Sequence, residues 1–184
     1  MENKIIHTVL IKSGKTISFR YPTIDDVEIF KDYINKISIE QSFLILQGFQ
    51  NTTESETKWL QDKLDKINKN KCVYICGFYK NNLVACSEIT LGSEAKAHLG
   101  SFGISVALGF RGQGLGQKIM EITIDESIKN LPELQIIDLE VFSKNKIAIN
   151  LYKKLGFIKY GLLPKALKRK GEYNDAILMY KKVK

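Results

Sequence analysis

Apolar residues recur along this chain at two spacings, and together these spacings predict a domain that mixes strands with helices. Short runs rich in apolar and β-branched residues are typical of strands, and turn residues such as glycine and asparagine separate them. These runs lie at residues 8–11, 16–20, 72–79, 83–91, 98–106, 135–142, 158–163 and 175–183. A basic stretch, residues 164–174, is expected to connect the last two of them.

Apolar residues at helical spacing mark four further segments. These segments lie at about residues 24–36, 53–68, 115–129 and within 143–157. Thr23 with Asp26, and Thr53 with Glu56, resemble capping boxes that open the first two helices. Gly156 is placed to end the last helix in the left-handed conformation.

One stretch joins a strand to a helix through glycines. After the run that ends at Val106 come Arg111 and then a glycine at every second position, Gly112, Gly114 and Gly116. A turn of this kind exposes backbone N–H groups beside the positive end of a helix dipole, which suits an anion and above all a phosphate. The alternative is a tight turn whose glycines only allow close packing.

The two common nucleotide signatures do not fit this stretch. A Walker A loop needs Lys and then Ser or Thr after its last glycine, whereas Leu115 follows Gly114. The dinucleotide fingerprint needs a glycine where Gln117 stands. The stretch therefore predicts a phosphate site of neither nucleotide class.

Composition narrows the class of protein without giving a function. The 184 residues, of which 44% are hydrophobic and 26% charged, suit one domain spanning 1–184. No apolar run approaches the roughly twenty residues of a membrane span, and the N-terminus lacks signal-peptide features, so we expect a cytoplasmic protein without a membrane partner. The net charge of +8 favours anionic partners, but lysine is spread along the chain, which makes nucleic acid the least favoured of them.

The cysteines and histidines argue against disulfides and metals. Cys72, Cys76 and Cys86 are odd in number, so we expect buried thiols. No metal site is expected, because His7 and His98 are the only histidines and further ligands are lacking.

A second motif follows the glycine stretch. From Asn145 the chain reads N-x-x-A-x-x-L-Y-x-x-x-G-F, and from Val106 it reads V-x-x-x-x-R-G-x-G-x-G. Together these motifs resemble the acyl-CoA binding core of the GCN5-related N-acetyltransferase (GNAT) superfamily. The start at residues 23–26 and the ending at 171–175 further resemble the branch of ribosomal-protein N-terminal and small-amine acetyltransferases.

The resemblance implies a fold. It is an α/β (α+β) fold with a mixed, mostly antiparallel sheet of six to seven strands flanked by about four helices. The fourth and fifth strands in the family's count, here residues 98–106 and 135–142, would splay apart and open a slot for the pantetheine arm of acetyl-CoA.

The resemblance also implies which residues hold acetyl-CoA, the acyl donor. The backbone of Ile104 or Val106 would pair with the pantetheine arm and polarise the thioester carbonyl. Asn145 matches the position whose side chain holds the arm, and Tyr152 matches the tyrosine that faces the departing sulfur. The side chain of Arg111 would either add charge or point to solvent. The expected backbone donors to the pyrophosphate are Arg111, Gly112, Gln113, Gly114, Leu115 and Gly116.

The same resemblance implies a general acid and a general base for the reaction. Tyr152 is the expected general acid, because a tyrosine with a pKa near about 10 stays protonated at neutral pH and can still donate. Glu88 is the tentative base, since members of the family often use a carboxylate on a neighbouring strand. Glu140 and His98 are further candidates, and Ser101 stands where several relatives carry glutamate.

The implied reaction is attack on acetyl-CoA by a primary amine, either a peptide or protein N-terminus or a small-molecule amine, in a ternary complex. An α-amine suits a site without an obvious general base, because its deprotonation at pH 7 costs about 1 kcal/mol, whereas that of a lysine side chain costs about 4–5 kcal/mol. The basic residues Lys165–Lys170 argue mildly against a polyamine acceptor if they border the acceptor mouth as in relatives; the alternative is a solvated loop. The alternative is a catalytically weak acyl-CoA-binding regulatory module; the acceptor's identity and a homodimer are left open.

Overall fold

Within residues 4–183, which this computed structural model describes, eight strands form one mixed sheet in the order β1-β2-β3-β4-β5-β6-β8-β7. Only the β5–β6 pair is parallel. The sheet has more than the six to seven strands of the family expectation, since the short β1 also pairs with β2 at one edge. The strands are β1 (His7–Leu10), β2 (Thr16–Arg20), β3 (Cys72–Tyr79), β4 (Asn82–Leu91), β5 (Leu99–Val106), β6 (Ile136–Phe142), β7 (Ile158–Arg169) and β8 (Glu172–Lys182).

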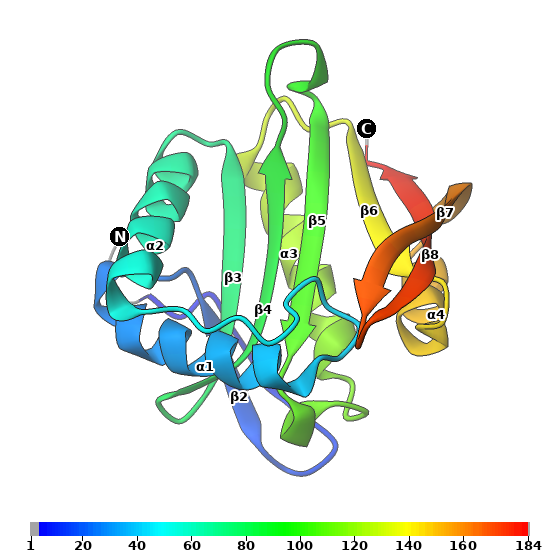
Figure 1. The fold of residues 1–184 in the computed structure, drawn as a ribbon. Coiled ribbons are helices and arrows are strands. Elements are labelled where there is room, and N and C mark those ends of the chain that lie inside the picture. The colour runs from blue at the N-terminus through cyan, green and yellow to red at the C-terminus, as the bar shows by residue number, and fades with distance from the viewer. Residues whose placement is uncertain (1–3, 184) are drawn as a thin grey trace.

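Helices cover both faces of the sheet (Figure 1). The helices α1 (Val27–Glu40) and α2 (Thr53–Asn68) lie on one face, and α3 (Leu115–Asn130) lies on the other. A shorter helix, α4 (Lys146–Lys154), follows β6. Alternate residues of β3 explain this arrangement: Tyr74 packs in the cluster with α1 and α2, whereas Ile75 packs in the cluster with α3.

The strands β5 and β6 pair only where they begin. Leu99, Gly100 and Ser101 face Ile136, Ile137 and Asp138, and the pairing stops there. Beyond that point β6 continues along β8 up to Phe142, while β5 continues along β4. Figure 1 shows the two strands diverging. We call the separated segments, residues 102–106 of β5 and 139–142 of β6, the splay; it confirms the predicted divergence.

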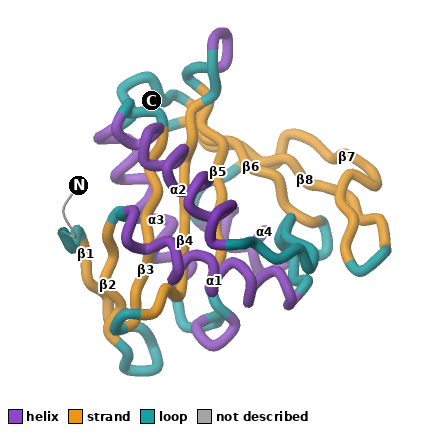
Figure 2. Tube along the Cα trace, turned by 60° about the vertical axis from the view of Figure 1, so that its left-hand side comes forward, coloured by secondary structure: helices purple, strands orange, loops and turns teal. Residues whose placement is uncertain are grey.

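The basic stretch 164–174 differs from the sequence expectation. Most of it is strand, because β7 runs on to Arg169 and β8 starts at Glu172, with the turn at Lys170 and Gly171. The register between the two strands shifts between Leu163 and Leu167, which accommodates Pro164 and its missing N–H. Figure 2 shows the β7–β8 hairpin projecting to one side of the other strands.

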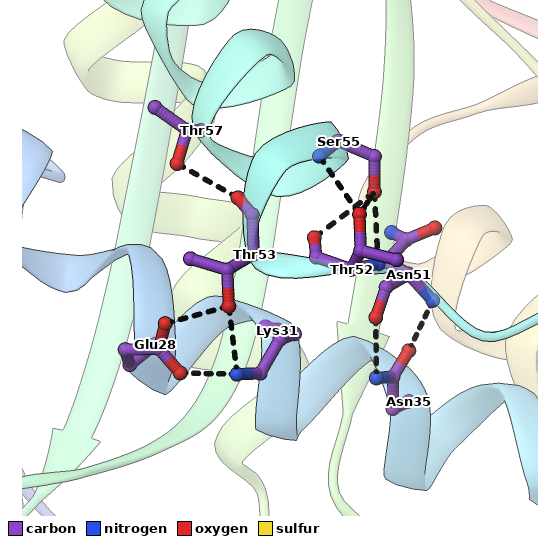
Figure 3. Close-up of polar contacts among 8 residues, drawn as sticks. All are labelled: Glu28, Lys31, Asn35, Asn51, Thr52, Thr53, Ser55 and Thr57. Atoms are coloured by element: carbon purple, nitrogen blue, oxygen red, sulfur yellow. Dashed lines mark hydrogen bonds and ion pairs between the residues drawn. The ribbon is translucent and has the colours of Figure 1, made fainter.

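Residues 41–52 connect α1 to α2, and the last residues of this connection are hydrogen-bonded to α1 (Figure 3). The side chain of Asn35 donates to the carbonyl of Asn51 at 3.0 Å and accepts from its N–H at 2.7 Å. Thr53 Oγ1 donates to Glu28 at 2.8 Å and accepts from Lys31 at 3.0 Å. The chain is therefore held in place as it enters α2.

The predicted helix ends are partly correct. Asp26 accepts the N–H of Thr23 at 2.8 Å, and Gly156 ends α4 with φ 86°, both as expected. The second capping box lies one residue earlier than predicted, because Thr52 accepts from Ser55 and Thr53 is engaged by Glu28. The first helix also continues past its expected end, since Ile37 and Ser38 are buried.

The three cysteines are buried and reduced, as expected. Among residues 4–183, no helix is long and apolar enough to cross a membrane. Likewise, the described part of the chain contains no group of three or more His, Cys, Asp or Glu residues that could hold a metal ion.

Candidate active site

The glycine stretch forms a loop at the start of α3 with free backbone donors. Gly112 and Gly114 have φ values of 72° and 86°, which favour glycine. The N–H of Lys118 is the first in the helix to find an acceptor, the carbonyl of Gly114 at 3.2 Å. In the described structure the N–H groups of residues 112–117 have no backbone acceptor. The loop therefore offers a row of donors at the positive end of a helix dipole.

The glycines of this loop do not serve close packing, with one exception. A Cβ atom added to Gly112 or Gly114 would meet nothing within 4 Å. At Gly116 it would lie 3.8 Å from the side chains of Val106 and Leu151. Gly112 and Gly114 are thus required by backbone conformation, and the space beside them is open. This geometry fits the pyrophosphate of a coenzyme A thioester and disfavours the packing alternative at these two positions.

Arg111 lies on this loop, but its side chain turns back from it. The Nε atom donates to the carbonyl of Val106 at 2.7 Å, and Nη2 donates to Glu40 of α1 at 2.6 Å. Its own backbone N–H donates to Leu108 at 3.3 Å. Of the donors expected from the sequence, Arg111 is therefore already engaged, both by its backbone N–H and by its side chain.

Ile104 and Val106 direct backbone groups into the splay. On one side of them, the N–H of Ala107 donates to Val84 of β4 at 2.9 Å. At the other end of β5, the carbonyl of His98 accepts from Gln135, beside β6, at 3.0 Å. Because neighbouring strand residues turn their backbone groups to opposite sides, those of even-numbered residues point away from β4. The N–H groups of Ile104 and Val106 thus face the side where β6 has separated.

Tyr152 is buried at 7% exposure among aromatic rings. Its ring centroid lies 6.2 Å from that of Phe102 and 6.0 Å from that of Phe157. Burial raises the pKa of Tyr152 to about 12. In the described residues its hydroxyl has no hydrogen-bond partner, so this group is protonated at neutral pH and available to donate.

Asn145 has a structural contact of its own. Its Oδ1 atom accepts the N–H of Ala148 at 3.2 Å and so caps α4. The amide Nδ2 has no partner among the described residues and is free to donate to a cofactor. The same residue thus both starts α4 and stands next to the end of β6.

Glu88 lies on the α1–α2 face of β4. Its Oε2 atom is ion-paired with Lys63 of α2 and accepts from Thr90 at 3.0 Å. On the other side, Oε1 would lie 3.7 Å from a Cβ atom at Gly103, the residue opposite on β5. Gly103 therefore leaves room beside this carboxylate. One strand separates Glu88 from the splay, so proton transfer to it would need a water molecule or a movement of the side chain.

The other candidates for the general base differ in how close they lie to the splay. Asp138, which the sequence motifs did not point to, faces Ser101 in the last pair before the splay, and burial raises its pKa. Glu140 is exposed on the same face of β6. His98 precedes β5 at the closed end of the sheet, away from the splay, which argues against a role in the reaction.

The sequence did not indicate one hydrogen bond beside the splay, between the hydroxyl groups of Tyr33 and Ser105. Tyr33 Oη lies 2.9 Å from Ser105 Oγ, which joins α1 to β5 between Ile104 and Val106. Burial raises the pKa of Tyr33 well above its usual value. The apolar face of α1 would have been the only sequence signal, because no motif contains Tyr33.

A cavity of about 180 Å³ lies elsewhere. Tyr21, Cys72, Glu126 and Asn130 are among its lining residues. Glu126 and Asn130 belong to the last turns of α3, at the opposite end from the glycine loop. This cavity therefore plays no part in the site.

Comparison with known proteins gives consistent matches. A model of the acetyltransferase (GNAT) family matches residues 39–157. The SPbeta prophage-derived uncharacterized N-acetyltransferase YokL of Bacillus subtilis (strain 168) is 27% identical over 167 residues, which cover 90% of this chain and 89% of that protein. A GNAT-family acetyltransferase from Streptococcus pneumoniae superposes with a TM-score of 0.83 at 22% identity, covering 91% of this chain and 99% of the other. The structure of yncA from Salmonella typhimurium, determined with its cofactor acetyl-CoA, gives a TM-score of 0.78 at 15% identity over 91% and 94% of the two chains.

Proposed function

The chain belongs to the acetyltransferase (GNAT) family, and on that premise we propose that it transfers the acetyl group of acetyl-CoA to a primary amine in a ternary complex. The acceptor would be a peptide or protein N-terminus or a small-molecule amine. One observation carries the proposal: the free N–H groups of residues 112–117 adjoin a strand, β5, whose N–H groups at Ile104 and Val106 are unpaired on the side of the splay. An anion site and an open strand edge, placed end to end, suit a ligand with a pyrophosphate and an amide-containing arm.

The proposed reaction is a direct transfer. The amine nitrogen attacks the thioester carbonyl carbon, the new N–C bond forms, and the C–S bond breaks with its electron pair leaving on sulfur. The N–H of Ile104 or Val106 polarises the carbonyl oxygen, in the manner of an oxyanion hole. Arg111 already occupies the carbonyl of Val106, which leaves the N–H of that residue as its free group.

Tyr152 would stabilise the departing sulfur. A thiol has a pKa near about 8.5, so complete proton transfer from a tyrosine with a pKa of about 12 would be uphill by about 5 kcal/mol. A hydrogen bond from the Tyr152 hydroxyl to the developing thiolate does not carry this cost. The general-acid role predicted from the sequence thus takes the form of hydrogen-bond donation. The amine nitrogen loses one proton to the base as the N–C bond forms, and that proton finally passes from the base to the thiolate.

Glu88 would receive the amine proton through a water molecule beside Gly103. Its pairing with Lys63 orients the carboxylate, and Oε1 faces the space that Gly103 leaves. Asp138 is the competing carboxylate, because it lies where the splay begins. We expect Glu88→Gln to lower thiol release more than Asp138→Asn; the reverse order would assign the base to Asp138.

The test is an assay of free thiol released from acetyl-CoA with a panel of amines and short peptides, with the N-acetylated product identified by mass spectrometry. We expect thiol release that depends on both substrates. Binding of acetyl-CoA without release across the whole panel would favour the regulatory module instead. A protein that fails to bind acetyl-CoA would contradict both functions.

A further inference from the structure

Long-range contacts bridge the open end of the splay on its α1 side. From the end of β5, the carbonyl of Val106 accepts from Arg111, and Arg111 pairs with Glu40 at 2.6 Å. From the end of β6, the ring of Phe142 packs on Phe43, with centroids 5.6 Å apart. Arg169 connects these two halves. We call this set the rim; its members are Glu40, Gln41, Phe43, Val106, Arg111, Phe142 and Arg169.

Arg169 occupies the middle of the rim. Its Nε atom donates to the carbonyl of Gln41 at 3.0 Å, and its guanidinium carbon lies 4.3 Å from the centroid of the Phe43 ring. The turn of the β7–β8 hairpin accordingly meets the chain just after α1, as Figure 1 shows. A guanidinium that lies over an aromatic ring and is fixed at Nε keeps its two terminal nitrogens aligned for a planar anion.

The two arginines of the rim differ in their charge partners. Arg111 is paired with Glu40, whereas Arg169 has no carboxylate within ion-pair distance among residues 4–183. Glu172 stands opposite Arg169 in the hairpin ladder, but its carboxylate is exposed and lies 3.8 Å from Lys144. Arg169 is therefore an uncompensated cation on the rim.

The platform beneath Arg169 is held in place. The N–H of Gly48 donates to the carbonyl and to the hydroxyl of Ser38, both at 3.0 Å, and Asn51 is tied to Asn35. The connection that carries Gln41 and Phe43 is thus attached to α1 at its middle and at its end. Arg169 would not have to order a loose loop when it binds an anion, which favours affinity.

We propose that Arg169 binds the carboxylate of the acceptor, so that the preferred acceptor is an amine that also carries a carboxylate, as a free amino acid does. This inference rests on the proposed acetyl transfer and narrows its substrate class. The acceptor has to approach the thioester from the side that the donor does not fill, and the rim borders that approach. A planar guanidinium binds a carboxylate through two parallel hydrogen bonds.

The experiment compares amino acids with their carboxamides as acceptors, at saturating acetyl-CoA, in the native protein and in Arg169→Gln. The quantity measured is kcat/KM for the amino acid divided by kcat/KM for its carboxamide. The α-amines of the two acceptors differ in basicity, but this difference cancels when the ratio is compared between protein variants. We expect this ratio to fall by about tenfold or more in Arg169→Gln, because the KM rises more for the acid than for the amide. Arg169→Lys should retain part of the preference.

Lys168→Gln is the matched control, since Lys168 is the exposed neighbour whose Nζ atom lies over Tyr173, 5.7 Å from its ring centroid, and not on the rim. Its ratio should equal that of the native protein. A measurement without any variant guards against misfolding: N-acetyl amino acids should inhibit the native protein more strongly than the corresponding amides. Equal inhibition, or a ratio unchanged by Arg169→Gln, would overturn the inference while acetyl transfer stands. The absence of thiol release with every amine would overturn the proposed function and this inference with it.

Discussion

In the proposed reaction, the surroundings of Tyr152 keep its hydroxyl protonated and able to donate a hydrogen bond. Phe102 and Phe157 pack on its ring, and burial raises the pKa of its hydroxyl to about 12. The side chain as a whole is 7% exposed, but its hydroxyl oxygen is not among the fully buried polar atoms without a partner, so a ligand could reach it. The spacing of Tyr152 within its motif could be read from the sequence, but the aromatic surroundings and the pKa required the fold.

Removing the hydroxyl of Tyr152 separates its chemical role from its packing role. In Tyr152→Phe the ring contacts remain, so we expect acetyl-CoA to bind nearly as before. Turnover should fall by about 10²-fold, because the developing thiolate loses its donor. Steady-state kinetics and calorimetric titration measure the two quantities. Unaltered turnover would remove Tyr152 from the reaction, and equal losses of binding and turnover would indicate a packing role.

Asp26 illustrates a residue whose ionisation stabilises the fold. Burial raises its pKa, but hydrogen bonds from Arg20 at 2.7 Å and from the N–H of Thr23 lower it more, so the net shift is downward. A carboxyl with a lowered folded-state pKa contributes stability above its unfolded pKa of about 3.9, and this contribution is lost as the pH falls through the folded value.

We therefore expect Asp26→Asn to lower the free energy of unfolding by about 3–5 kcal/mol at pH 7, because it leaves Arg20, whose side chain is only 14% exposed, without its charge partner. The difference from the native protein should shrink as the pH falls below about 3.9, because the unfolded chain then binds a proton at Asp26, and it should vanish once the pH is below the lowered folded pKa. Urea denaturation at the two pH values measures this. Asp62→Asn, in an exposed pair with Lys66, is the control and should change stability little. A difference that does not depend on pH would contradict the ionic explanation.

At the scale of elements, the glycine loop and α3 form the part of the site that the sequence could predict in most detail. The positive φ values at Gly112 and Gly114 and the free N–H groups follow from local rules of turns and helix starts. The length of β7 and β8 did not follow from such rules. Residues 164–174, which extend both strands toward the turn, are basic, contain a proline and lack an apolar pattern. Only the register across the hairpin shows that they are paired.

The loop can be tested at Gly114, where φ is 86°. An alanine there would be strained by about 1–2 kcal/mol, although a Cβ atom would meet no neighbour within 4 Å. We expect Gly114→Ala to weaken acetyl-CoA binding about tenfold, because relief of the strain turns the N–H groups away from the pyrophosphate. Gly109→Ala is the control, since Gly109 has equal space and no positive φ. Equal affinities of the two variants would argue against a role of the loop conformation.

At the scale of the whole molecule, the site depends on contacts between distant parts of the chain. Arg111 meets Glu40 across 71 positions, and Arg169 meets Gln41 across 128. No local pattern contains such pairs, so the sequence predicted the cofactor half of the site but not the rim. The proposed donor half draws on two short stretches of sequence, one around the start of α3 and one in α4. The proposed acceptor half is assembled by the fold from α1, the connection after it and the β7–β8 hairpin.

The proposed function requires that acetyl-CoA lies along the splay with its pyrophosphate on the glycine loop. The most direct measurement is the change in backbone amide chemical shifts, resolved by residue, as acetyl-CoA is added to the ¹⁵N-labelled protein. We expect saturable shifts that are largest at residues 112–117 and at Ile104 and Val106, since those N–H groups are free in this structure. Saturable binding with its largest shifts elsewhere, for example around the cavity at Tyr21 and Asn130, would contradict the account.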